Sequence, residues 1–242
     1  MSDIPLALAI DLTQSTPLSP DLVMPDLVMP AVPANICFTG LINDLVEKHW
    51  FVAENYLSQA LCTQLQKDLQ CLHEQSLLSP AGIGRGKNRL LNEAVRGDYT
   101  HWLDGSSLAQ QAYLAIMQEL KNTLNRELFL GLFEYESHYA LYPSGAFYKK
   151  HVDSFRGRSN RKVTTVLYLN PAWQIQDAGE MRLYHPKTQQ PLLDIAPKSG
   201  TLVCFLSEDL PHEVLPTNAD RMSIAGWFRC NASLNGRIDP AL

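Results

Sequence analysis

Hydrophobic spacing divides the chain into a helical part and a later part rich in short strands. Apolar residues recur at helical spacing over 41–46 and 61–72, where Ser58 is a candidate N-cap for the second run. A longer apolar stripe over 108–128 predicts a helix that packs one side on a sheet. Between these helices, residues 95–103 predict a short strand or a hairpin edge.

After Gly131 the spacing changes to alternation, and β-branched and aromatic residues become frequent. Turn-forming groups that contain Pro, Gly or Asn separate the apolar segments. The predicted strands are 133–140, 146–152, 162–169, 180–184, 200–205, 212–214 and 222–228. Helices followed by many short strands favour a mainly β fold with supporting α-helices. We therefore predict a β-sandwich or jelly-roll core packed against N-terminal and central helices.

These patterns divide the chain into four segments. Residues 1–38 form a Pro-rich tail that we predict to be disordered, because closely spaced prolines block helix and strand pairing. The pentapeptide Asp-Leu-Val-Met-Pro occurs there twice, at 21–25 and 26–30, and we interpret it as sequence slippage, with a short partner-binding motif as the alternative. A helical support region at 39–132, a core at 133–231 and a C-terminal tail at 232–242 follow.

Composition narrows the class of protein. A chain of 242 residues that is 45% hydrophobic can bury one substantial core. Its net charge of −5 argues against a nucleic-acid partner. Five cysteines without a C-x-x-C pair argue against a disulfide framework and suit a reducing cytosol. Without a basic leader or a long apolar run, the sequence indicates a cytoplasmic protein with no membrane partner.

The candidate chemistry begins at His151 and Asp153. Two residues apart on a strand, their side chains point to the same side. His212 opens a later predicted strand and can complete the set. Two imidazoles and one carboxylate on one face of a metal leave other positions open, as in non-haem Fe(II) oxygenases. For any one of these histidines alone, a structural role is the default interpretation.

Arg221 stands directly before the strand predicted at 222–228. In a jelly roll, an arginine there can point inward, where its charge is uncompensated unless an anion binds. A small dicarboxylate held by two hydrogen bonds from the guanidinium would supply that anion.

Several motifs, in order over about residues 51 to 230, resemble one family. This family is the Fe(II)- and 2-oxoglutarate-dependent prolyl hydroxylases, specifically the bacterial relatives of the hypoxia-inducible-factor type. The motifs are Tyr142-Pro-Ser-Gly-Ala-Phe-Tyr148-Lys-Lys-His151-Val-Asp153, Val166-Leu-Tyr168-Leu-Asn-Pro, Pro211-His212-Glu-Val-Leu-Pro and Arg221-Met-Ser-Ile-Ala-Gly-Trp227. The resemblance implies a double-stranded β-helix, the jelly roll. The connection from Tyr142 to His151 departs from the animal enzymes by being about one residue shorter.

The resemblance implies roles for individual residues. Three of them match the Fe(II) ligands: His151, Asp153 and His212. Arg221 matches the arginine that pairs with the distal carboxylate of 2-oxoglutarate. Tyr168 matches a tyrosine that binds the same carboxylate. Tyr142 matches a tyrosine that lines the cosubstrate pocket. For Tyr168 the alternative is a core tyrosine whose hydroxyl is satisfied internally.

Three further residues match positions near the peptide substrate. Arg96 and Asp98 lie in a stretch that resembles the mobile substrate loop of the family, and Trp227 resembles a residue of the substrate wall. For Trp227, core packing is an equally good interpretation.

The function implied by the resemblance is hydroxylation of a prolyl residue of a partner protein, with release of succinate and CO2. It implies Fe(II), 2-oxoglutarate and O2, with ascorbate (vitamin C) as a candidate cofactor and a translation elongation factor as a candidate substrate. One alternative is the same dioxygenase chemistry on a free amino acid or another small molecule. Another is a non-catalytic jelly-roll sensor module that binds metal.

Overall fold

The computed structural model describes residues 36–82, 92, 94–154 and 160–231. The predicted N-terminal tail up to residue 35 and the predicted C-terminal tail at 232–242 lie outside the described residues. Phe38, the last residue of the predicted N-terminal tail, is described, is only 8% exposed and belongs to the hydrophobic core. The packed part of the chain therefore begins before Thr39.

Helices form where the apolar spacing predicted them. They are α1 (Thr39–Lys48), α2 (Gln59–Glu74) and α3 (Leu108–Leu128), with a short 3-10 helix at Ile175–Asp177. Ser58 is the predicted N-cap of α2, and its Oγ accepts a hydrogen bond from the Leu61 N–H at 3.3 Å. No helix of the described residues combines the length and apolarity needed to cross a membrane.

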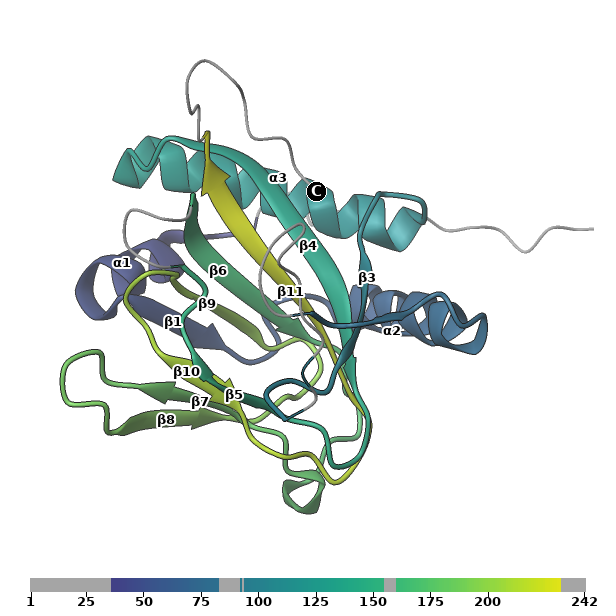
Figure 1. The fold of residues 1–242 in the computed structure, drawn as a ribbon. Helices are drawn as coiled ribbons and strands as arrows, with labels where there is room; N and C mark the ends of the chain where they lie inside the picture. The colour runs from purple at the N-terminus through teal and green to yellow at the C-terminus, as the bar shows by residue number, and fades with distance from the viewer. Residues whose placement is uncertain (1–35, 83–91, 93, 155–159, 232–242) are drawn as a thin grey trace, which may run out of the picture.

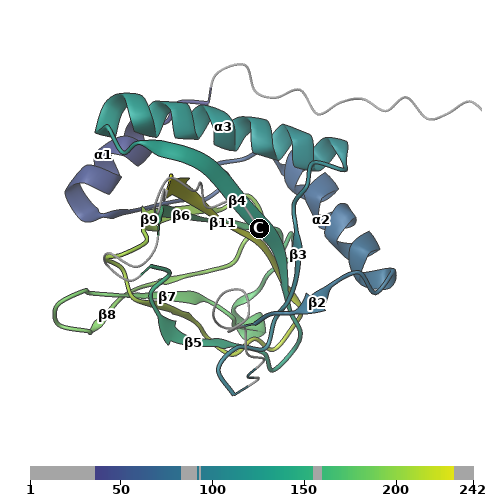
Figure 2. The ribbon, with the colours of Figure 1, turned by 45° about the horizontal axis from the view of Figure 1, so that its top comes forward.

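Two antiparallel sheets face each other, and the three helices cover the outer face of the larger one (Figures 1 and 2). The larger sheet has the order β1 (Trp50–Ala53), β9 (Leu202–Leu206), β6 (Arg161–Tyr168), β11 (Arg221–Cys230), β4 (Leu132–Tyr142), β3 (Tyr99–Trp102) and β2 (Ser79–Pro80). The smaller sheet has the order β5 (Tyr148–His151), β10 (His212–Val214), β7 (Met181–Tyr184) and β8 (Pro191–Ile195). This arrangement confirms the predicted mainly β jelly roll with supporting helices.

Strand alternation divides the core into two layers. In β9, Leu202 and Cys204 pack among the helices, whereas Val203 and Phe205 pack toward the smaller sheet. Successive side chains of a strand point to opposite faces, so one apolar run serves both layers. The larger sheet is therefore fixed from both sides, which gives the side chains on its inner face a rigid support.

Among the edge strands that were not predicted are β1 of the larger sheet and β8 of the smaller sheet. β1 is only four residues long and follows α1 directly, so its apolar residues extend a helical pattern. β8 begins at Pro191, and its first two residues are exposed, so it lacks the alternation of a half-buried strand. Both are edge strands, where proline and short length are tolerated.

The burial of Phe38 leads to a test by truncation. A chain that begins at Thr39 is expected to unfold with a free energy about 2 kcal/mol lower than one that begins at Ile36, because a buried phenylalanine contributes roughly that amount. The loss also removes the Cys37 carbonyl that accepts a hydrogen bond from the Tyr56 hydroxyl at 3.2 Å. Urea unfolding of the two truncated chains measures the difference, and equal stabilities would contradict the assignment of Phe38 to the core.

Candidate metal centre and adjoining pocket

His151, Asp153 and His212 come together at the smaller sheet. Their candidate ligand atoms all lie within 4.8 Å of one another. His151 at the end of β5 pairs with His212 at the start of β10, and the ring centroids are 4.3 Å apart. One Asp153 oxygen lies 3.6 Å from His151 Nε2, and the other lies 3.7 Å from His212 Nε2. The predicted convergence of the three side chains is thus observed.

Backbone carbonyls orient both imidazoles. His151 Nδ1 lies 2.7 Å from the Lys149 carbonyl oxygen, and His212 Nδ1 lies 3.1 Å from that of Leu210. Because a carbonyl oxygen only accepts, each Nδ1 carries a hydrogen and donates it, and each Nε2 is turned toward Asp153. Burial lowers the pKa of His212 to about 4, with a further contribution from His151, so its ring is neutral near pH 7. Neutral imidazole is the form that binds a metal.

Asp153 is held in its ionised form. Burial alone would raise the pKa of this carboxyl group, but His212 and His151 bring it well below its usual range. Thr164 Oγ1 donates a hydrogen bond of 2.8 Å to Asp153 Oδ2, and the Ser207 hydroxyl lies 2.8 Å from the same Thr164 oxygen. Two imidazoles and one oriented carboxylate fit an Fe(II) ion with open coordination positions.

Arg221 points into the space between the sheets beside this centre. Its side chain is almost fully buried, Nε donates to the Gly179 carbonyl at 2.8 Å, and Nη1 lies 3.4 Å from the Ser223 hydroxyl. Its guanidinium carbon lies 5.0 Å from the ring centroids of both Tyr142 and Tyr168. Among the described residues, no carboxylate forms an ion pair with Arg221, so its buried positive charge lacks a full counter-charge.

The Tyr168 hydroxyl provides a second indication of an anion site. It is buried and makes no hydrogen bond with a described residue, and burial raises its pKa. A buried hydroxyl without a partner costs about 1–3 kcal/mol, so it marks a place where a ligand can bind. The hydroxyl and the guanidinium are both donors, and a carboxylate accepts from both. The pocket therefore fits one end of a small dicarboxylate.

The sequence did not reveal two supporting residues. Thr164 holds Asp153, although it lies in a strand where any threonine could serve packing alone. Gly179 has φ +77, and an added Cβ would lie 2.9 Å from Thr217 and 3.1 Å from Arg221 Cδ. A side chain there would displace Arg221, and the turn-forming Asp-Ala-Gly run was the only signal of this close approach.

Arg96 and Asp98 contact the metal centre indirectly, because the Tyr148 ring lies between Arg96 and His151. Arg96 donates two hydrogen bonds of 2.6 Å to Asp98, which is only 2% exposed. The Arg96 guanidinium carbon lies 4.6 Å from the Tyr148 ring centroid, and that ring stacks on His151 at 3.6 Å. The pair therefore supports the wall of the site from the side of the 95–103 segment. A direct contact with substrate remains a prediction for both residues.

Trp227 lies on the inner face of β11 and is 7% exposed. The Arg161 guanidinium carbon lies 3.6 Å from its ring, and Glu136 holds that arginine at 2.7 Å. Trp227 also pairs with Thr164 of β6, the residue that hydrogen-bonds Asp153. It therefore stands close to the metal centre, and its contact with a substrate remains a prediction.

Glu136 is expected to be important for stability, because it pairs with two arginines at once. It is 5% exposed and lies 2.7 Å from Arg161 and 2.8 Å from Arg229. The substitution Glu136→Gln is expected to lower the free energy of unfolding by about 3 kcal/mol, the cost of breaking a buried ion pair. Glu127→Gln is the control, since Glu127 is half exposed. Urea unfolding measures both, and equal effects would contradict the role of Glu136.

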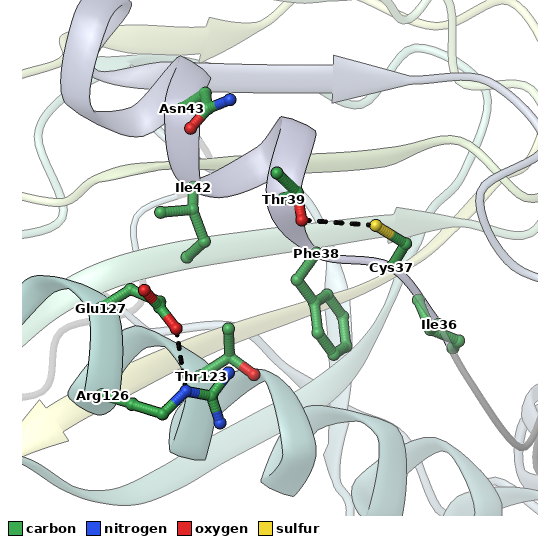
Figure 3. A pocket seen from close by; sticks show the side chains of 9 residues that line it. All are labelled: Ile36, Cys37, Phe38, Thr39, Ile42, Asn43, Thr123, Arg126 and Glu127. Atoms are coloured by element: carbon green, nitrogen blue, oxygen red, sulfur yellow. Dashed lines mark hydrogen bonds and ion pairs between the residues drawn. The ribbon is translucent and has the colours of Figure 1, made fainter.

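A cavity of about 370 Å³ lies elsewhere, between the start of α1 and the end of α3 (Figure 3). The ion pair of Arg126 with Glu127 lies along one side, and the Cys37 thiol bonds the Thr39 hydroxyl on the other. These helices cover the outer face of the larger sheet, so this cavity is not part of the metal centre.

Comparisons with known proteins agree with this geometry. Residues 137–229 match the model of the 2OG-Fe(II) oxygenase superfamily. The crystal structure of a Pseudomonas putida prolyl-4-hydroxylase is similar, with a TM-score of 0.72 and 39% identity over 78% of this chain and 96% of that chain. A Trichoplax adhaerens prolyl hydroxylase, solved with a peptide fragment of the hypoxia inducible factor oxygen degradation domain, has a TM-score of 0.71 and 26% identity over 78% of this chain and 87% of that chain.

Curated relatives are longer proteins. The hypoxia-inducible factor prolyl hydroxylase of Caenorhabditis elegans is 30% identical over 203 residues, which are 78% of this chain and 27% of the relative. Egl nine homolog 1 of Homo sapiens is 26% identical over 184 residues, which are 73% of this chain and 43% of the relative. The chain thus spans between about a quarter and a half of the length of these two relatives.

Proposed function

Because the chain belongs to the Fe(II)- and 2-oxoglutarate-dependent prolyl hydroxylase family, we propose that it hydroxylates a prolyl residue of a partner protein, with 2-oxoglutarate and O2 as cosubstrates and succinate and CO2 as co-products. The observation that carries the proposal is the convergence of His151, Asp153 and His212 beside a buried arginine. A metal centre or a buried cation alone would fit many proteins. Their combination fits a dioxygenase that binds a dicarboxylate next to its metal.

The residues of the chain have distinct tasks in this proposal. His151, Asp153 and His212 would hold Fe(II), which supplies the activation of O2 and the oxidative decarboxylation of 2-oxoglutarate. The carbonyls of Lys149 and Leu210 keep each Nε2 free for the metal. Both side-chain oxygens of Asp153 face a histidine, and the Thr164 hydroxyl fixes their orientation. Little reorganisation is therefore needed when the metal binds.

Arg221 and Tyr168 would bind the distal carboxylate of 2-oxoglutarate, since both offer donors in a buried place. Tyr142 stacks beside the guanidinium and closes one side of the pocket. These contacts exclude water and fix the cosubstrate in one orientation. The removal of hydrogen from the target C–H bond and its replacement by a hydroxyl group both depend on this positioning.

Arg96, Asp98 and Trp227 would border the place where the target residue enters. A translation elongation factor is the first partner protein to test, because the chain resembles bacterial members of the family. We also propose ascorbate as the reductant that keeps the iron ferrous. All five cysteines are free, which supports a reducing compartment such as the cytoplasm.

The test uses the purified protein with added Fe(II), 2-oxoglutarate and a library of synthetic peptides that each contain one proline. Iron-dependent succinate formation that rises with a peptide, together with a gain of 16 Da on its proline, is the expected result. Turnover with free proline and with no peptide would favour the small-molecule alternative. Tight iron binding without any succinate would favour a sensor module and contradict the proposal.

A further inference from the structure

Three aromatic side chains line the inner face of the larger sheet near the metal centre. Trp102 of β3 pairs with His138 of β4, and their ring centroids are 5.2 Å apart and nearly perpendicular. Trp227 of β11 lies 5.4 Å from His138 and 6.4 Å from Trp102. We refer to Trp102, His138 and Trp227 as the aromatic wall. Its outer member, Trp102, is 37% exposed, so the wall runs from the surface to the interior.

Strand register places the aromatic wall between the dicarboxylate pocket at Arg221 and the metal centre. Along β4, His138 and Tyr142 point to the same face, and Tyr142 lies beside the Arg221 guanidinium. On the opposite side, Trp227 pairs with Thr164, which donates to Asp153. His138 therefore faces the same space as the dicarboxylate pocket and the carboxylate ligand of the metal centre.

Small residues lie beside His138 on the inner face of the larger sheet. Ala225 of β11 pairs with His138 across the two strands. Ala140 lies two positions further along β4, on the same face, and is 2% exposed. Each of these side chains is a single methyl group, so a substrate backbone that followed the aromatic wall would meet no bulky side chain at these two positions.

The His138 ring has one nitrogen to offer to a ligand. Nδ1 lies 3.0 Å from the Tyr139 carbonyl oxygen, so Nδ1 carries the hydrogen and Nε2 has the lone pair. Nε2 makes no hydrogen bond with a described residue. Burial, with a smaller contribution from Arg96, lowers the pKa of His138 to about 4, so the ring is neutral near pH 7. His138 is then the hydrogen-bond acceptor among the three rings of the aromatic wall.

The neighbouring Trp227 has the complementary group. Its Nε1 is buried and has no hydrogen-bond partner among the described residues. An indole N–H only donates, whereas the His138 Nε2 only accepts. Each peptide unit offers one donor and one acceptor, so a backbone that passes along the wall can satisfy both groups.

We propose that His138 determines substrate specificity by accepting a hydrogen bond from a backbone N–H next to the hydroxylated proline. A prolyl residue within a chain has no N–H of its own, so the donor must belong to a neighbouring residue. This inference rests on the proposed prolyl hydroxylase function and deepens it, because it requires a peptide substrate. Free proline has no neighbouring peptide N–H to offer.

Two substitutions of His138 test the proposal, assayed with one peptide that the unsubstituted protein hydroxylates. His138→Phe keeps the ring shape and removes the acceptor, and it is expected to raise the peptide KM about tenfold, which corresponds to about 1.4 kcal/mol. His138→Gln keeps an acceptor oxygen and is expected to remain within about threefold of the unsubstituted protein. His101→Phe is the control, since His101 is on β3 beside Trp102 but points to the other face.

The same peptide with single N-methyl groups on its backbone locates the donor. In the unsubstituted protein, methylation of one amide next to the proline is expected to raise the KM about tenfold. With His138→Phe, the same methylation is expected to have little further effect, because the bond is already lost. Melting temperatures show whether each variant is folded.

An unchanged peptide KM for folded His138→Phe would overturn the inference, as would equal effects of N-methylation in both proteins. If His138→Phe does not fold, the methylation scan of the unsubstituted protein decides, and the absence of a sensitive amide overturns the inference. The proposed function fails separately, when the unsubstituted protein hydroxylates no peptide at all. In that case the inference falls with it.

Discussion

Replacing His212 by alanine is expected to abolish both iron retention and turnover. His212 is one of only three candidate ligands that converge in the described part of the chain, and it is 5% exposed. Two remaining ligands, His151 and Asp153, would hold the metal much more weakly. The substitution also removes the imidazole that faces one oxygen of Asp153 at 3.7 Å.

The iron content of the purified variant and its rate of succinate formation measure the two effects. His73→Ala is the matched control, because His73 is exposed in the last turn of α2, on the other side of the larger sheet. Its iron content and rate are expected to equal those of the unsubstituted protein. A His212→Ala protein that keeps one iron per chain and full turnover would show that His151, Asp153 and His212 do not form the iron site.

Replacing Arg221 by alanine is expected to weaken 2-oxoglutarate binding about 100-fold, which corresponds to about 2.7 kcal/mol. A buried, charge-assisted contact with a carboxylate is of that order. The iron content is expected to stay unchanged, because Arg221 bonds Gly179 and Ser223 and lies beside Tyr142 and Tyr168, none of which is a candidate ligand. The KM for 2-oxoglutarate and the shift in melting temperature that the cosubstrate causes both report the loss.

Arg182→Ala is the control for this change, since it also removes one arginine. Arg182 is partly exposed on the smaller sheet and pairs with Asp194 at 2.7 Å. Its loss is expected to leave the KM for 2-oxoglutarate unaltered. If Arg221→Ala showed the same dependence on 2-oxoglutarate as the Arg182 control, the assigned role of Arg221 would be refuted.

Local patterns in the sequence were sufficient for most of the fold. The helix at Leu108–Leu128 has the predicted bounds, because its apolar stripe persists over its full length. The Ser58 cap was also predictable, since the capping bond spans only three residues. Edge strands such as β8 were missed because they pack on one side only and carry little alternation.

The sequence also predicted that the residues of the candidate site lie close together, but it did not predict which residues hold them in place. His151 and Asp153 share a strand-spacing signal, whereas the bond from Thr164 to Asp153 depends on the pairing of distant segments. His138 had no signal at all. Its neighbours Trp102 and Trp227 come from two other strands, and only the folded sheet shows that Nε2 has no hydrogen-bond partner among the described residues. Contacts between distant segments therefore mark the limit of prediction from local pattern.

The fate of molecular oxygen tests the central claim most directly. The purified protein is incubated with Fe(II), 2-oxoglutarate, a proline-containing peptide and ¹⁸O2, and both products are examined by mass spectrometry. A dioxygenase places one oxygen atom in succinate and the other in the new hydroxyl group. The account predicts label in succinate and on the hydroxylated proline in equal amounts. A hydroxylated peptide without label, or labelled succinate with no modified peptide in the whole library, would contradict it.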